Sequence, residues 1–152
     1  MMRLSVQLQG MDKLSLGVGY LAKAALAGLK LGCDGAAGLF EDEAKTLVPV
    51  KTGNLRDHIH FYTTVDTDTS QQREVTPVYE LEGSGKLDPP YARRIELGFV
   101  GQDSLGRHYH QAAQPYMAPA FSNKQDEARQ MIKEEVTGAL DERMNLIAAG
   151  RH

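Results

Sequence analysis

The segment at residues 47–65, LVPVKTGNLRDHIHFYTTV, marks the main change of pattern in the chain, because a helical pattern ends in it and a strand pattern begins. Pro49 disfavours the α region for the residue before it, so we expect the preceding helix to end at residues 47–48. Thr52 and Gly53 predict a tight turn, in which Gly53 is free to adopt a positive φ angle. Alternating residues from Leu55 onward predict a strand. We therefore assign structural roles, without chemistry, to Pro49, Thr52, Gly53 and Leu55.

The segment before this junction predicts a short strand followed by a long helix. Polar and apolar residues alternate at residues 3–10, which is typical of a half-buried strand. From Val18 to Leu47, apolar residues recur at helical spacing. Glycines, each of which disfavours a helix interior by about 1 kcal/mol relative to Ala, occur at Gly28, Gly32, Gly35 and Gly38. We expect this helix to pack closely against a neighbouring backbone, with a kink or break around residues 32–35 as the alternative.

The segment after the junction predicts a second strand and then a long irregular region. Residues 73–83 are the strand candidate, in which Pro77 indicates an edge position or a bulge. Residues 91–98 fit either a strand or a short helix. No periodicity is found at residues 98–116, so we expect a long loop there. Loops of this length in compact domains often have a role in binding.

The last helix is expected at residues 117–150, where Pro119 fits the first turn. Its predicted apolar stripe consists of Ala128, Met131, Ile132, Val136, Ala139, Leu140 and Ile147. Together, these elements predict an α+β fold in which a long N-terminal helix and the C-terminal helix pack on a small antiparallel β-sheet, with a long loop before the last helix. The chain has 152 residues, which is the size of one ordinary domain, so we expect a single domain over residues 1–152.

Composition and charge favour a protein that is made and acts in the cytoplasm. The net charge of −3 gives no reason to expect tight nucleic-acid binding, which needs clustered Lys and Arg side chains. Cys33 is the single cysteine, so an intrachain disulfide is impossible. The start of the chain lacks the apolar segment of a secretory signal. Lys23 and Lys30 interrupt the apolar run at residues 16–31, so we expect no membrane span.

Histidine pairs are the strongest candidates for chemistry. His58 and His60 share one face of the predicted strand, and His108 and His110 lie in the predicted loop. Neutral imidazole is a common zinc ligand, but no third or fourth ligand follows at a convincing spacing. We therefore expect no enzyme, no catalytic residue, no cofactor and no metal site. A metal-dependent hydrolase built on these histidines is the weaker alternative.

Three segments, taken in order, resemble one known protein family. LVPVKTGNLRDHI (residues 47–59) resembles the motif that follows the long helix in neck or tail-completion proteins of tailed bacteriophages: an apolar residue, Pro, two variable residues, Thr-Gly and Leu-Arg. YARRIELGFVGQDSLGR (residues 91–107) resembles the Tyr-Ala, apolar, Glu, apolar, Gly block of that family. QPYMAPAF (residues 114–121) resembles the Gln-Pro, aromatic, Pro-Ala-Phe start of its last helix. The family includes minor tail proteins of lambda-like phages.

This resemblance implies a structural virion protein of the head–tail junction that assembles in the host cytoplasm. It implies a homo-oligomeric ring, with six-fold symmetry, that connects the head connector or stopper to the tail terminator or tail tube. Genomic DNA can pass through such a ring, and no membrane is involved. A tail-assembly chaperone, which binds during assembly and then leaves, is the alternative within the same setting.

We expect residues 99–114 to be the main docking element of such a protein. The segment is polar and aperiodic, yet it holds side chains that form directed contacts, and these are Asp103, Arg107, His108, Tyr109 and Gln111. Arg107 is the strongest candidate, because a guanidinium offers a planar fork of donors to carboxylates and carbonyls across an interface. The alternative is that Arg107 pairs with Asp103 inside its own loop.

Overall fold

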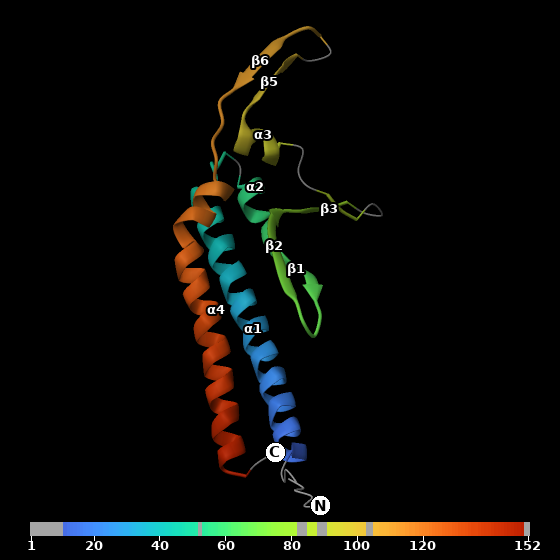
Figure 1. Cartoon of the computed structure of the whole chain (residues 1–152). Coiled ribbons are helices and arrows are strands. Elements are labelled where there is room, and N and C mark those ends of the chain that lie inside the picture. Colours follow the sequence, from blue (N-terminus) through green and yellow to red (C-terminus); the bar gives the residue numbers. More distant parts are fainter. Residues whose placement is uncertain (1–10, 52, 82–84, 88–90, 103–104, 151–152) are drawn as a thin grey trace, which may run out of the picture.

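The computed structural model describes residues 11–51, 53–81, 85–87, 91–102 and 105–150 (Figure 1). Its elements are α1 (Met11–Leu47), α2 (Asn54–Asp57), β1 (Ile59–Asp66), β2 (Gln71–Pro77), β3 (Tyr79–Leu81), β4 (Gly85–Leu87), α3 (Ala92–Leu97), β5 (Phe99–Gln102), β6 (His108–Gln111) and α4 (Met117–Ala148). The described strands form three two-stranded antiparallel sheets, β1–β2, β3–β4 and β5–β6. This arrangement confirms the predicted α+β fold. The strand expected at residues 3–10 lies outside the described residues.

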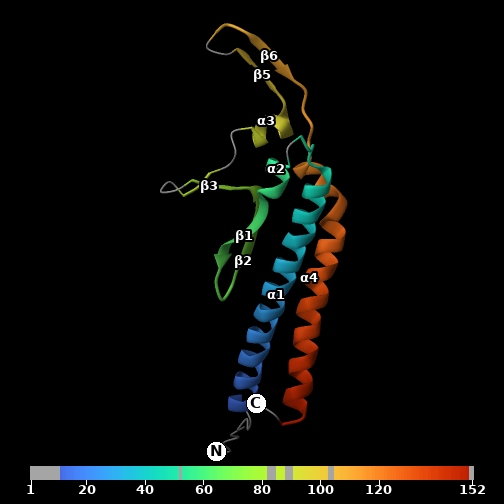
Figure 2. The same ribbon diagram turned by 180° about the vertical axis from the view of Figure 1, so that it is seen from behind.

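The two long helices form the body of the molecule. Helices α1 and α4 run antiparallel and side by side in both views (Figures 1 and 2). The β1–β2 hairpin lies along α1 on the side away from α4, so α1 is the central element (Figure 1). Helix α3 and the β5–β6 hairpin extend beyond the end of the body where α1 ends and α4 begins.

Glycines allow α1 and α4 to approach closely. A Cβ added to Gly28 would lie 2.8 Å from the Cα of Val136, and one added to Gly32 would lie 2.7 Å from the Cα of Ile132. Backbone contacts this short leave no space for a side chain at either position. The predicted close packing is therefore confirmed, and α1 continues as one helix through the residues where a kink was the alternative. Gly38 differs, because nothing lies within 4 Å of its added Cβ.

The junction after α1 matches the prediction only in part. Helix α1 ends at Leu47, and Gly53 adopts a positive φ of 82°. Thr52 lies outside the described residues. The prediction that Leu55 begins a strand is wrong, because Leu55 lies in α2 and β1 begins at Ile59. Leu55 and Ile59 nevertheless enter the same core, where both are buried.

The β1–β2 hairpin pairs Ile59 with Pro77 at one end and Asp66 with Gln71 beside the turn. Each strand of a two-stranded sheet is an edge strand, so the predicted edge position of Pro77 is confirmed. The strand expected at residues 73–83 is divided in the structure. Strand β2 ends at Pro77, and β3 pairs with β4 as a separate hairpin.

The segment expected to be a long loop contains a hairpin. Residues 91–98, which fitted either a strand or a helix, form α3. After it, β5 and β6 pair antiparallel, with Phe99 opposite Gln111. Most of the described side chains on these strands are exposed. No buried face therefore imposes an alternating apolar pattern on the sequence, which explains why the strands could not be predicted.

The hydrophobic core lies where α1 and α4 meet the small elements. Its buried residues are Ala44, Val48, Leu55, Ile59, Ala92, Tyr116 and Ala120. Each of the three segments that carry the family resemblance contributes one of these residues at least: Leu55, Ala92 and Tyr116. Helix α4 also confirms the predicted last helix, since Pro119 lies in its first turn and the predicted apolar stripe is buried or half-buried.

Candidate functional site: the projecting β5–β6 hairpin

The β5–β6 hairpin (residues 99–111), named the arm here, projects beyond the ends of α1 and α4 (Figures 1 and 2). Most of the side chains predicted to dock lie on it and are exposed, and these are Arg107, His108, Tyr109 and Gln111. Asp103 lies outside the described residues, so its pairing with Arg107 stays a prediction. Val100 and Leu105 are each 76% exposed. The arm thus combines apolar and polar groups that a partner could cover.

One side of the arm is hollowed. A cavity of about 440 Å³ is lined by Arg94, Phe99, Gln102, Tyr109, His110 and Gln111. The guanidinium of Arg94 lies 4.4 Å from the centroid of the Phe99 ring, which is the geometry of a cation–π contact. A Cβ added to Gly101 would lie 2.2 Å from that ring, so the ring lies against the backbone of β5. The cavity offers hydrogen-bonding and aromatic groups, which suit the binding of a polar partner segment.

The root of the arm is joined to α4 by Glu96, which the sequence analysis did not single out. Its carboxylate accepts hydrogen bonds from the backbone N–H groups of Tyr116 at 2.7 Å, Met117 at 3.0 Å and Ala118 at 3.1 Å. The first N–H groups of a helix have no partner within the helix, and a negative charge there also favours the helix dipole. Glu96 therefore caps α4 from α3. Its partners lie about twenty residues later in the chain, and this separation hides the role from sequence reading.

Gly98 lets the returning end of the arm pass close to its start. Its backbone has φ 76° and ψ 171°, a region that is essentially restricted to glycine. A Cβ at this position would lie 2.9 Å from the carbonyl oxygen of Gln111 and 3.0 Å from the nitrogen of Ala113. The backbone N–H of Gln114 also donates to the carbonyl of Ile95 at 2.7 Å. The arm is therefore held firmly at its root.

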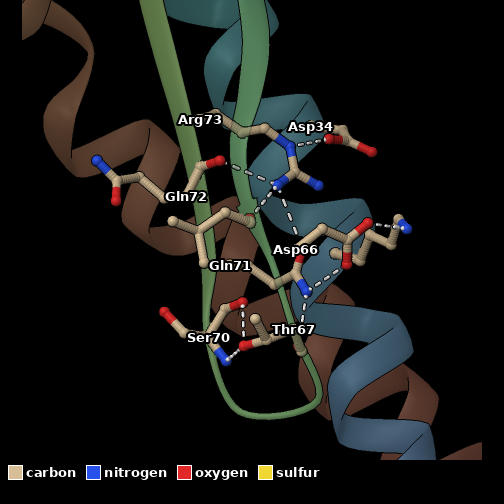
Figure 3. Close-up of polar contacts among 9 residues, drawn as sticks. Asp34, Asp66, Thr67, Ser70, Gln71, Gln72 and Arg73 are labelled. Carbon is tan, nitrogen blue, oxygen red and sulfur yellow. Dashed lines mark hydrogen bonds and ion pairs between the residues drawn. The ribbon is translucent and has the colours of Figure 1, made fainter.

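The β1–β2 hairpin is held in a different way, along its length. Arg73 of β2 donates to the carboxylate of Asp34 on α1 (Figure 3). Lys30 of α1 donates to Asp66, which also accepts a hydrogen bond from Gln71 at 2.8 Å. These hydrogen bonds, from Lys30 first and Gln71 second, lower the pKa of Asp66. The hairpin is thus fixed to the helix by side chains.

Glu41 of α1 fixes the other end of β1. Its carboxylate accepts the backbone N–H of Phe61 at 2.8 Å and the ammonium of Lys45 at 2.6 Å. His60 Nδ1 lies 3.4 Å from the same carboxylate. Partial burial acts to raise the pKa of Glu41, but the hydrogen bonds from Lys45 and Phe61 outweigh it, so the pKa lies below its ordinary value. Glu41 therefore satisfies a backbone donor on an edge strand.

The two histidine pairs do not form one site. His58 and His60 belong to the end of α2 and to β1, whereas His108 and His110 lie on the arm, well separated in both views (Figures 1 and 2). In the part of the chain that the structure describes, no group of three or more His, Cys, Asp and Glu side chains could hold a metal ion. The geometry gives the zinc alternative no support.

The predicted turn residues line a second, smaller cavity of about 170 Å³, to which Pro49, Gly53 and Leu55 contribute. The side-chain amide of Asn54 donates to the hydroxyl of Tyr91 at 3.0 Å and so links this turn to the start of α3. The turn therefore helps to position the small elements that carry the arm.

Helix α1 is rich in apolar residues although much of its surface is exposed. By length and composition alone, Leu16–Leu47 could cross a membrane, and little of its most apolar stretch is buried. The same composition occurs in the core helices of globular proteins, so it is weak support for a membrane span. Helix α4, which lies alongside, has exposed charged residues such as Glu134 and Asp141.

No protein-family model, curated protein or solved structure matches this chain.

Proposed function

We propose that this protein is a structural subunit of the head–tail junction of a tailed bacteriophage, where it forms a neck or tail-completion ring. In this role it connects the head connector or stopper to the tail terminator or tail tube, and genomic DNA passes through the ring. The protein acts in the virion, by contact alone, without catalysis, metal or cofactor.

The observation that carries this proposal is the arm. It projects from a two-helix body, its root is joined to the start of α4 through Glu96, and its described residues are largely exposed. A rooted projection that carries exposed Val100, Leu105 and Arg107 fits a protein that docks to a neighbour during assembly.

The resemblance in sequence supports the same role. The three segments that resemble the phage family are far apart in the chain, yet Leu55, Ala92 and Tyr116 from them meet in one core. The family-like residues Glu96 and Gly98 build the root of the arm. The resemblance therefore coincides with the architecture that positions the arm.

Reversing one charge on the arm tests the proposal. We expect Arg107→Glu to leave circular dichroism and melting nearly unchanged, because Arg107 is exposed. Heads and tails should then fail to join when the variant replaces the wild-type protein in an infection or reconstitution assay. The matched control is Arg129→Glu, an exposed arginine on α4, which should join heads to tails normally.

Two results would overturn the proposal. Joining at wild-type efficiency by Arg107→Glu would remove the arm as the docking element. Absence of the protein from purified virions would favour the tail-assembly chaperone instead, and an immunoblot of particles measures this directly.

A further inference from the structure

The N-terminal half of α1 has an apolar surface that the described part of the chain leaves largely uncovered. Between Leu16 and Leu31, its only charged residues are Lys23 and Lys30. Leu16 is 62% exposed, Val18 59% and Leu31 61%. Residues two apart on a helix differ by about 200° in direction, so Leu16 and Val18 are exposed on nearly opposite sides. A helix that is apolar all round normally lies in an interior.

Among the elements that the structure describes, α4 is the one that lies beside this half of α1. The β1–β2 hairpin reaches along α1 as far as Lys30, which donates to Asp66 at the end of β1. Beyond that point, the described element that lies beside α1 in both views is α4 (Figures 1 and 2). Lipid is a poor cover, because Glu134, Asp141 and other charged residues are exposed on α4 over the same length. A protein surface can contact both the apolar residues of α1 and the charged residues of α4.

The contacts between α1 and α4 fix which residues lie at the same height. Gly28 lies beside Val136, and Gly32 lies beside Ile132. The helices are antiparallel, so a residue five positions before Gly28 in the sequence lies at the same height along the helix pair as a residue five positions after Val136. Lys23 is therefore level with Asp141.

Lys23 and Asp141 also point away from each other within one copy. Lys23 lies five residues from Gly28, and Asp141 lies five residues from Val136. Five residues of helix rotate a side chain by about 140°, so each points away from the other helix of the same copy. Both residues are exposed. One outer side of the helix pair thus presents Lys23 amid apolar residues, and the opposite outer side presents Asp141 at the same height.

We propose that a second copy of this chain covers the N-terminal half of α1 with the outer side of its own α4. Rotation about an axis parallel to the helices keeps every height unchanged, so Lys23 of one copy meets Asp141 of the next. An α1-to-α1 contact would instead place Lys23 against Lys23. A contact between two different surfaces repeats around an axis, and it forms a ring when the rotation between copies closes on itself. The inference rests on the proposed function only for this ring symmetry.

Reversing the charges tests the contact in purified full-length protein. We expect the wild type to self-associate in sedimentation equilibrium. Lys23→Glu and Asp141→Lys should each weaken association about tenfold at low salt. The double variant, Lys23→Glu with Asp141→Lys, should restore it. The matched control is Asp126→Lys, which makes the same charge change near the other end of α4 and should leave association unchanged.

Cysteine cross-linking tests the geometry. In a Cys33→Ala background, Lys23→Cys with Asp141→Cys should give a ladder of disulfide-linked multimers under oxidation, because every copy offers both ends of the contact. The single change Lys23→Cys should give no covalent dimer. A dimer from this single variant would indicate the α1-to-α1 contact and overturn the proposal.

Three further outcomes would also overturn it. These are a wild type that stays monomeric at all concentrations, a double variant that fails to regain association, and a monomer that binds phosphatidylcholine vesicles. Failure here is distinguishable from failure of the phage role. Self-association is measured on the purified protein, whereas Arg107→Glu is measured by the joining of heads and tails.

Discussion

The β1–β2 hairpin and the arm are both two-stranded, yet the protein holds them in opposite ways. The first is tied along its length to α1 through Arg73, Asp66 and the backbone N–H of Phe61. The second is fixed only at its root, through Glu96 and Gly98, and most of its length projects into solvent. An isolated two-stranded hairpin is marginally stable in water. The stability of the arm therefore depends on the contacts at its root.

The largest effect is expected from the root, at Gly98. Gly98→Ala should lower the free energy of unfolding by about 3 kcal/mol, because a Cβ would force both an unfavourable backbone region and contact with Gln111. Urea unfolding measures the change. Gly138→Ala is the control, since nothing lies within 4 Å of its added Cβ and it should stabilise α4 by about 0.5–1 kcal/mol. A stable Gly98→Ala would mean that the root is looser than the structure indicates.

The next effect concerns the link between the root and α4. Glu96→Ala leaves the N–H groups at the start of α4 without their carboxylate and should cost about 2 kcal/mol. Hydrogen exchange should increase first in the first turn of α4 and in the arm. Arg93→Ala, an exposed change on the same short helix, should stay within about 0.5 kcal/mol of wild type. Equal exchange in both variants would argue against the cap.

The β1–β2 hairpin and the arm can be compared directly by changing one arginine in each to methionine. The Arg73 side chain is only 4% exposed, and Arg73→Met removes its pairing with Asp34, which should cost about 1–2 kcal/mol. Arg107→Met on the arm should change the free energy of unfolding by less than about 0.5 kcal/mol, because its side chain is exposed. Thermal melting of both variants measures the contrast. Equal losses would show that the arm is as integral to the fold as β1–β2.

The smallest effect is the pH dependence of the anchor at Glu41. Its pKa in the folded protein lies below the ordinary 4.5, so its stabilising effect is present above about pH 4.5 and is lost as the pH falls through the folded value. Glu41→Gln should cost about 1 kcal/mol at pH 7. The difference between the two proteins should shrink in acid. Urea titrations at pH 7 and pH 3 measure it, and a constant difference would contradict the role of the charge.

The long-helix elements could be predicted from the sequence by itself. Their apolar periodicity, the stop before Pro49 and the positive φ of Gly53 are local properties, because each depends on steric limits within a few residues. The same holds for Pro77 at an edge and Pro119 in a first turn. Even the glycines of α1 indicated close backbone packing before any partner was known.

Only the tertiary structure decided the elements whose partners are distant in sequence. Leu55 lies in a helical turn and is buried in the same core as Ile59, and alternation in the sequence does not contain that information. The arm lacks a buried face, so its strands leave no periodic pattern. Glu96 caps α4 because folding brings α3 to the start of that helix. Local sequence patterns reflect the steric preferences of neighbouring residues. The cap on α4, the pairing of strands and the equal height of Lys23 and Asp141 arise only when separate segments pack together.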